Sequence, residues 1–464
     1  MTTEIPYADA RTDRLAADGF PADAVRARAR VGSAQLFPPV GAYGRAVFGA
    51  DPVANSNDSL DRLRLVPPVF MPERLEKLID LGREPMPGDV ELGTTIGGFR
   101  SPVPVFCSAL GSTDSGGELG VALSRQAGRL GLPMVIGENV VPVSGYGRDS
   151  DAPAQRSLLA RITAYADNVP DGLGGVAVQQ STEDADAEVW NLAYSDPAAQ
   201  RLLDSGRLAF ELKVGQGAKP GLGGMTVLGT GQADALADRY SISDVLGDPS
   251  HRLRSASPGT FTDEILRQQI RLMRNNYPRA RVWVKLHPGR DIAHAASVAW
   301  AAGADAVTVD GAEGGTGWAP LSSLDHVGLP LAECLYRIAQ HHAWARPGGC
   351  LMATGRIWEG TRAVKALALG ATAAGLGRAA LLAVDEDRDE GLIRLVDCLT
   401  VELGLLISAL GHYHPAALSP DDLWAPTDSW AATGLGATTD FIASAVPAQQ
   451  LHIPTGTPRK ATSA

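Results

Sequence analysis

The sequence predicts an α/β fold, a (β/α)8 (TIM) barrel, and three observations support this. Eight short apolar runs recur between residues 102 and 377. Segments with apolar residues at helical spacing separate these runs. Glycine-containing loops follow the last three runs, where such barrels bind phosphate. An open doubly wound sheet is the alternative, but eight strand–helix units without a second pattern favour the closed barrel.

The elements follow from apolar periodicity and from turn residues at their ends. Residues 74–81 predict a short amphipathic helix closed by Gly82, and residues 90–105 predict a hairpin or two short strands. The barrel strands are expected at residues 102–106, 133–137, 174–179, 208–214, 282–286, 306–309, 350–354 and 373–377. Helices are expected at residues 116–131, 158–166, 184–194, 262–276 and 291–302, with a long interruption at 215–259. A final long apolar helix, ended by Gly411, is expected after the eighth strand.

These elements divide the chain into three parts. Residues 1–59 are turn-rich and form an N-terminal extension that packs on, or caps, a larger body. Residues 60–414 form the barrel. Residues 415–464 form a C-terminal segment with few periodic stretches, and we expect its end to be flexible.

Composition excludes several classes of protein. A net charge of −11 argues against nucleic acid or an anionic membrane as a partner, and no apolar run approaches the length of a membrane span. The first residues are polar and mixed in charge, unlike a signal peptide. The four cysteines lack metal-type spacing, which argues against zinc and disulfides. We therefore expect a cytoplasmic protein that binds no metal.

Active-site residues of such a barrel lie at the carboxyl ends of its strands. Glycine lets backbone amides approach an anion closely, and an arginine adds charge. The loops after the sixth, seventh and eighth strands, with Lys285 one strand earlier, therefore predict a phosphate site. Its candidate residues are Gly314, Gly315, Thr316, Gly317, Gly355, Arg356, Gly377 and Arg378.

Several longer motifs then resemble one family. KVGQGAKPGLGG (213–224), VDGAEGGTGWAPL (309–321) and ATGRIWEGTRAVKALALGATAAGLGRAAL (353–381) are similar to the FMN-binding synthase domain of glutamate synthase. The resemblance covers roughly residues 60–410, in the right order. QGAKPG followed by GG is long and unusual, which makes it more specific than a lone glycine motif. By this resemblance the phosphate-bearing ligand is FMN.

The resemblance also implies cofactor contacts. Loops 314–317, 354–356 and 375–378 would hold the phosphate and ribityl chain of FMN, and Gln216 would contact the cofactor. Ser108 and Ala109 would lie along the flavin ring. Lys285 would lie near its pyrimidine end and stabilise the negative charge that reduction places there. A surface salt bridge is the alternative for Lys285, although an apolar strand is an unusual place for one.

Substrate contacts are implied in the same way. Lys219, with Lys213 in the same loop, would contact the carboxylate side of the substrate; a solvated loop charge is the alternative. Glu138 would orient an amine or move a proton. The alternative is a structural role, in which its carboxylate stabilises the N-terminus of a helix through the helix dipole. Arg239 lies at the spacing of a substrate-carboxylate arginine, and Trp318 borders the pocket.

The chain departs from the family pattern at four places. The family's iron–sulfur cysteines follow the last strand, but residues 378–391 contain no cysteine. No glutaminase domain with an N-terminal cysteine is expected. Leu222 and Met225 replace a glutamate and a glutamine, and Trp318 replaces a small residue. These changes predict a smaller and more apolar pocket.

Three functions fit these features. The first is an FMN-dependent oxidoreductase acting on a C–N bond of an amino-acid, keto-acid or imine substrate, with glutamate synthase-like amine transfer. An electron-donor or amidotransferase protein is a candidate partner for this reaction, and we expect a homo-oligomer. The second is a redox-neutral flavoenzyme of the isomerase type. The third is a flavin-binding subunit of a larger complex.

Overall fold

The structure is a computed structural model that describes most of the chain up to residue 425. The described residues are 15–40, 58–69, 84–111, 114–138, 158–181, 189–217, 225–237, 241–244, 247, 249–255, 261–315, 319–341 and 349–425. All elements below belong to the unit Met1–Trp424.

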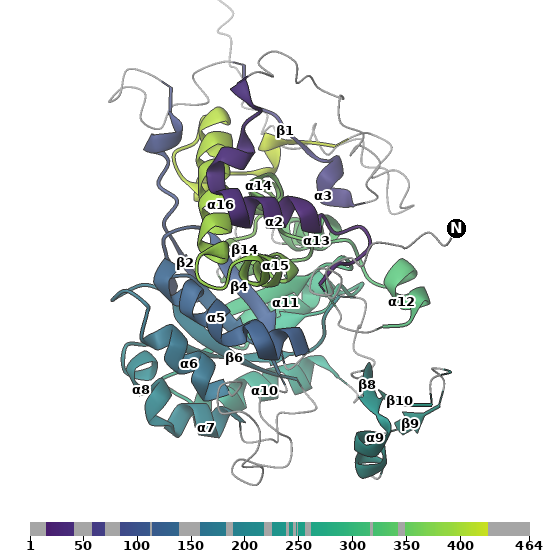
Figure 1. The fold of residues 1–464 in the computed structure, drawn as a ribbon. Helices are drawn as coiled ribbons and strands as arrows, with labels where there is room; N and C mark the ends of the chain where they lie inside the picture. Colours follow the sequence, from purple (N-terminus) through teal and green to yellow (C-terminus); the bar gives the residue numbers. More distant parts are fainter. Residues whose placement is uncertain are drawn as a thin grey trace, which may run out of the picture. The chain divides into compact units, whose positions relative to one another are not determined.

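Eight parallel strands close into a barrel (Figure 1), as predicted. In barrel order they are β4 (Val105–Leu110), β5 (Pro133–Ile136), β6 (Gly175–Ser181), β7 (Leu208–Lys213), β11 (Arg281–Leu286), β12 (Ala306–Asp310), β13 (Cys350–Thr354) and β14 (Ala373–Leu376), which pairs with β4. Their residues are buried on both faces, which explains their nearly continuous apolar sequences.

The first strand differs from its predicted bounds. It was expected to end at Phe106, with Cys107, Ser108 and Ala109 in the following loop. In the structure β4 continues to Leu110, so these three residues lie within the strand. The small polar Ser108 suggests a turn in the sequence, but its side chain is buried inside the barrel.

Helices between and after the strands cover the barrel. They are α5 (Asp114–Leu130), α6 (Leu158–Ala166), α7 (Val189–Ser195), α8 (Pro197–Asp204), α10 (Asp263–Asn276), α11 (Ile292–Ala301), α12 (Leu321–His326), α13 (Leu331–His341), α14 (Gly360–Ala368), α15 (Arg378–Glu386) and α16 (Gly391–Ala409). The sequence analysis missed α8, which begins at a standard signal: the Asp196 side chain accepts a hydrogen bond from the Ala198 amide, and Pro197 comes first.

The single long helix expected after the last strand is wrong, because two helices form there. Between α15 and α16 the Asp387 carboxylate accepts hydrogen bonds from the amides of Asp389 and Glu390, at 2.9 and 3.1 Å. This local turn competes with continued helix. The helix predicted at residues 74–81 lies outside the described residues.

A ring of apolar side chains fills the barrel toward the amino ends of its strands. Each strand contributes one buried residue: Phe106, Val135, Ala177, Ala209, Trp283, Ala306, Met352 and Ala373. The predicted hairpin forms as β2 (Thr94–Ile96) and β3 (Phe99–Ser101). Its Ile96 and Phe99 pack into the same cluster, and the Trp283 indole donates to the Gly97 carbonyl at 3.0 Å. This end of the barrel is therefore closed by packing.

Two further segments lie outside the strands and helices of the barrel: a small sheet after β7 and a helix near the amino terminus. The interruption after β7 contains an antiparallel sheet of β8 (Met225–Gly229), β10 (His251–Ser255) and β9 (Ser241–Ser243), with α9 (Thr230–Leu236). Helix α2 (Ala22–Val31) packs on α15 and α16 (Figure 1). Its Arg26 pairs with Asp385 at 2.7 Å, and its Arg28 with Glu402 at 2.7 Å. Over the described part of the chain, every helix is too short or too polar to span a membrane.

Candidate functional site

The barrel interior becomes polar one layer above the apolar ring. Residues i and i+2 of a strand face the same side, so the next inward residues lie two positions further along each strand. On seven strands these are two glycines, Gly137 and Gly375, and five buried polar residues: Gln179, Glu211, Lys285, Thr308 and Thr354. In β4, whose pairing with β5 is irregular between Cys107 and Leu110, Ser108 is also buried. Buried polar groups are costly unless they are hydrogen-bonded, and buried charges are costly unless they are paired, so a polar layer inside a barrel is unusual. This layer therefore marks the carboxyl end of the barrel as the candidate site.

Lys285 is a buried cation within this layer. Its Nζ lies 3.3 Å from Asp310 Oδ2, and its side chain is 7% exposed. Burial alone would lower the pKa of Lys285, but the carboxylates of Asp310, Glu211 and Glu138 outweigh burial and raise the pKa. A surface salt bridge therefore does not describe this lysine.

Glu211 is a second buried charge, which the sequence analysis missed. Its carboxylate accepts a hydrogen bond from the Thr308 hydroxyl at 2.8 Å and another from the Gln179 amide. Burial raises the pKa of Glu211, against the opposing effects of Lys285 and these hydrogen bonds. The signal was present, since a glutamate inside the apolar strand FELK needs the same explanation as Lys285 in VWVKL.

Glu138 and Lys213 meet across the mouth of the barrel. Glu138 follows β5 and Lys213 ends β7, and their side chains form a half-buried ion pair. Burial by itself would raise the pKa of Glu138, but Lys213 and, more weakly, Lys285 outweigh it, so the pKa lies below its usual value. The structure thus places an ionised carboxylate near two lysines.

The loops after β12 and β13 contain the predicted glycines and lie at the carboxyl end of the barrel. Their strands are neighbours of each other, and β13 is also paired with β14, so the three predicted glycine loops leave the barrel side by side. A Cβ added at Gly314 would lie 2.4 Å from Asp310 Oδ1, so only glycine fits there. Gln216 joins the loops by donating from Nε2 to the Gly315 carbonyl at 3.0 Å. Close-packed glycines beside a buried lysine fit a phosphate-bearing flavin.

The two predicted phosphate arginines are engaged elsewhere in this arrangement. Arg356 pairs with Asp58 at 3.1 Å and with Asp61 at 3.2 Å. Arg378 donates to the Leu15 carbonyl at 2.7 Å. Arg356 is also the one described non-glycine residue with positive φ, at 54°, a strained conformation often found at functional sites.

Several predicted site residues lie outside the described residues. These are Lys219, Arg239, Thr316, Gly317 and Trp318. Ser108 and Ala109 are described, in the last half of β4, with Ala109 packed against the apolar ring. Gly377 directly precedes α15.

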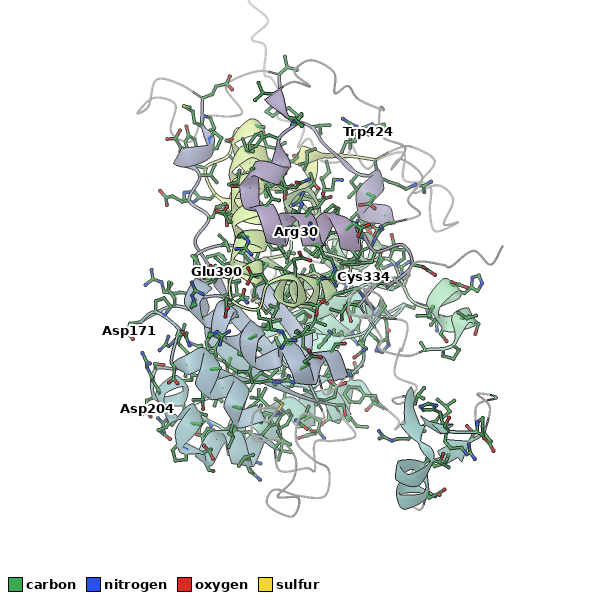
Figure 2. All side chains as sticks on the ribbon, viewed as in Figure 1. Arg30, Asp171, Asp204, Cys334, Glu390 and Trp424 are labelled. Atoms are coloured by element: carbon green, nitrogen blue, oxygen red, sulfur yellow. The ribbon has the colours of Figure 1, made fainter. Side chains whose placement is uncertain are left out.

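The four cysteines are free thiols within the described residues. Cys107, Cys398 and Cys334 are buried, the last labelled on α13 in Figure 2, and Cys350 is half-buried. Burial raises the pKa of Cys107 to about 12, which makes it a poor nucleophile. No group of three potential metal ligands gathers in the part of the chain that the structure describes.

Comparison with known proteins confirms the predicted resemblance. Residues 169–388 match the model of a conserved region in glutamate synthase. The archaeal-type NADPH glutamate synthase of Thermotoga maritima is 33% identical over 183 residues, or 38% of this chain and 34% of that protein. A glutamate synthase large subunit-like protein of Rhizobium meliloti is 29% identical over 281 residues, or 58% of this chain and 59% of that protein. The chain spans about a third of the length of the archaeal-type relatives it matches.

Solved structures share the barrel fold. A chimera of (S)-mandelate dehydrogenase has a TM-score of 0.51 at 20% identity, with 88% of this chain and 99% of that chain covered. A flavocytochrome b2 variant with bound pyruvate also has a TM-score of 0.51, at 18% identity, with 88% and 84% covered.

Proposed function

We propose that this glutamate synthase-like chain is an FMN-dependent oxidoreductase that acts on a C–N bond of an amino-acid, keto-acid or imine substrate. The observation that carries the proposal is the convergence of Lys285 and the Glu138–Lys213 pair at one barrel mouth. The match of residues 169–388 to glutamate synthase supports the same reaction class.

The cofactor would be held by the polar end of the barrel. Backbone amides of the loops at 314–317, 354–356 and 375–378 would bind its phosphate and ribityl chain, and Ser108, Ala109 and Gln216 would contact it. FMN supplies hydride transfer when bound. The chain supplies the positive charge of Lys285, which opposes the negative charge that reduction adds to the flavin pyrimidine.

The substrate would lie between the flavin and the loop after β7. Lys219 and Arg239 would contact its carboxylate, and Trp318 would limit the pocket size. Glu138, held ionised beside Lys213, would accept or return the proton of the reacting amine. The positive charges of Lys219 and Arg239 would also lower the free-energy cost of moving the substrate carboxylate out of water.

Replacing Lys213 with Met is expected to move the acid limb of the pH–rate profile to higher pH. Glu138 would lose the largest influence that lowers its pKa, while the effect of burial, which raises the pKa, would remain. The reactive ionised form would then disappear at a higher pH. The measurement is kcat/KM against pH for wild type, Lys213→Met and Glu138→Gln. An acid limb that stays in place in Lys213→Met would exclude Glu138 as the titrating base.

Electron balance tests the reaction class. The reduced protein is mixed anaerobically with amino-acid, keto-acid and amine combinations, and flavin reoxidation is followed. Turnover without net use of any donor or acceptor would replace the oxidoreductase with the isomerase-type alternative. Full activity of an assembled complex containing Glu138→Gln and Lys219→Ala would instead support a non-catalytic flavin-binding subunit.

The proposed reaction also needs a source of electrons or ammonia. The missing cysteines after β14 leave this segment without an internal iron–sulfur relay, so an electron-donor or amidotransferase partner protein would complete the reaction. We further propose a cytoplasmic homo-oligomer built from the extension 1–59, the barrel 60–414 and the C-terminal segment 415–464.

A further inference from the structure

Asp310, the last residue of β12, contacts β11, β13 and the loop after β7 at the centre of the candidate site. Its Oδ1 accepts a hydrogen bond from the Thr354 hydroxyl of β13 at 2.7 Å. Its Oδ2 accepts one from the Gly217 amide in the loop after β7 at 3.2 Å, and lies 3.3 Å from Lys285 Nζ on β11. The side chain is 4% exposed, so all three contacts are made away from water.

Two glycines adapt to this carboxylate. Gly217 has a left-handed backbone, with φ of 36°, and its amide reaches Asp310 in that conformation. Gly314 approaches Asp310 from the loop after β12, where a Cβ would lie within 2.9 Å of both carboxylate oxygens. The carboxylate thus holds the loop after β7 through the Gly217 amide, and it leaves room only for glycine at position 314 in the loop after β12.

We propose that Asp310 is a positioning residue that couples the substrate loop after β7 to the charge of Lys285 beside the flavin. One oxygen, Oδ2, faces both the Gly217 amide and the Lys285 ammonium. A displacement of the loop therefore changes the anionic partner of Lys285, and the reverse holds as well. The inference rests on the proposed flavin role of Lys285 for its redox part, but its loop part stands on the apoprotein geometry.

Two substitutions separate the charge of Asp310 from its hydrogen bonds. In Asp310→Asn the amide oxygen can still accept from Gly217. The new NH2 group can donate a hydrogen bond to the Thr354 hydroxyl oxygen. The hydroxyl hydrogen can then be donated to the Val309 carbonyl, which lies 3.3 Å from the Thr354 oxygen. Asp310→Ala removes both the charge and the acceptors. Asp305→Asn is the matched control, because it makes the same change at the other end of β12. Asp305 directly precedes this strand and accepts hydrogen bonds from the Val282 amide at 2.8 Å and from Arg274 at 2.7 Å.

The test uses the full-length protein as purified, with two readouts. Hydrogen exchange of the peptide that contains residues 214–217 reports the loop without requiring FMN. The midpoint potential of the bound flavin reports the charge. We expect Asp310→Asn to keep the exchange protection and to raise the potential, since the unneutralised Lys285 favours the reduced flavin. The expected size is at least a tenfold change in the equilibrium constant for two-electron reduction, about 30 mV. We expect Asp310→Ala to lose the protection at residues 214–217.

Each outcome decides a separate point. Unchanged exchange in Asp310→Ala overturns the loop part. If that variant does not fold, Asp310→Ser takes its place, because its shorter side chain withdraws the acceptor from the Gly217 amide, and the same loss of protection is expected. Lost protection in Asp310→Asn, relative to Asp305→Asn, contradicts the claim that the hydrogen bond holds the loop without the charge. A potential in Asp310→Asn equal to that of Asp305→Asn overturns the coupling. A wild-type protein that takes up no FMN overturns the proposed function and the redox part together, while the exchange result still decides whether Asp310 holds the loop.

Discussion

Lys285→Ala is expected to lower the midpoint potential of bound FMN and to reduce turnover by about 100- to 1,000-fold, the usual cost of losing one preorganised hydrogen-bond donor. Lys285 is buried beside Asp310, and Glu211 and Glu138 also act on its charge. Without the lysine, reduction would add negative charge to a site that already holds three carboxylates. The reduced flavin would therefore be disfavoured twice, by the lost cation and by the remaining anions.

The measurement is a spectroscopic redox titration of the FMN-loaded variant beside the wild type. Lys285→Arg is the matched control, since it keeps a positive charge on a side chain of similar length. Its bound FMN should have a midpoint potential close to that of the wild type. A Lys285→Ala protein that binds FMN with the wild-type potential would remove Lys285 from the redox site.

Arg362→Ala is expected to lower the free energy of unfolding by about 3–5 kcal/mol, the range for breaking a buried ion pair from one side. Arg362 on α14 is fully buried and binds Asp58 at 2.6 Å and also Asp61. These aspartates precede the first barrel strand, β4, by more than 40 residues, and they also pair with Arg356. Removing Arg362 would leave Asp58, whose side chain is 3% exposed, with less compensating charge in a dry environment.

Urea unfolding of Arg362→Ala gives this value directly. Arg388→Ala provides the comparison, because Arg388 pairs with Glu118 at the surface, with side chains 45% and 32% exposed. That loss should stay within about 1 kcal/mol. Equal destabilisation by the two substitutions would show that the Asp58–Arg362 pair is not the structural link inferred from its burial.

The sequence predicted the strands well because each is a buried apolar run. Its errors have local physical causes. The end of β4 was placed too early because Ser108 is a small polar residue, and burial inside the barrel is a tertiary property. The break before α16 depends on Asp387 binding two following amides, which apolar periodicity does not reveal.

The sequence identified several residues of the candidate site, but it did not reveal which of them contact each other. Lys285 was identified because a lysine in an apolar strand needs a reason, and Glu211 could have been found in the same way. The Glu138–Lys213 pair joins residues 75 positions apart, from strands separated by β6 in the barrel. Asp310 was considered only as the start of a glycine loop. Its three contacts come from three other segments, so only the closed barrel shows them together.

Cofactor content is the most direct test of the central claim that this barrel mouth binds FMN. The purified full-length protein is examined by its visible spectrum, and the released cofactor is identified by chromatography and by sensitivity to phosphatase. We expect a yellow protein that releases FMN in equimolar amount, and weaker FMN retention in Gly314→Ala, where the new Cβ would meet Asp310. A folded, colourless protein that takes up no FMN on incubation would contradict it.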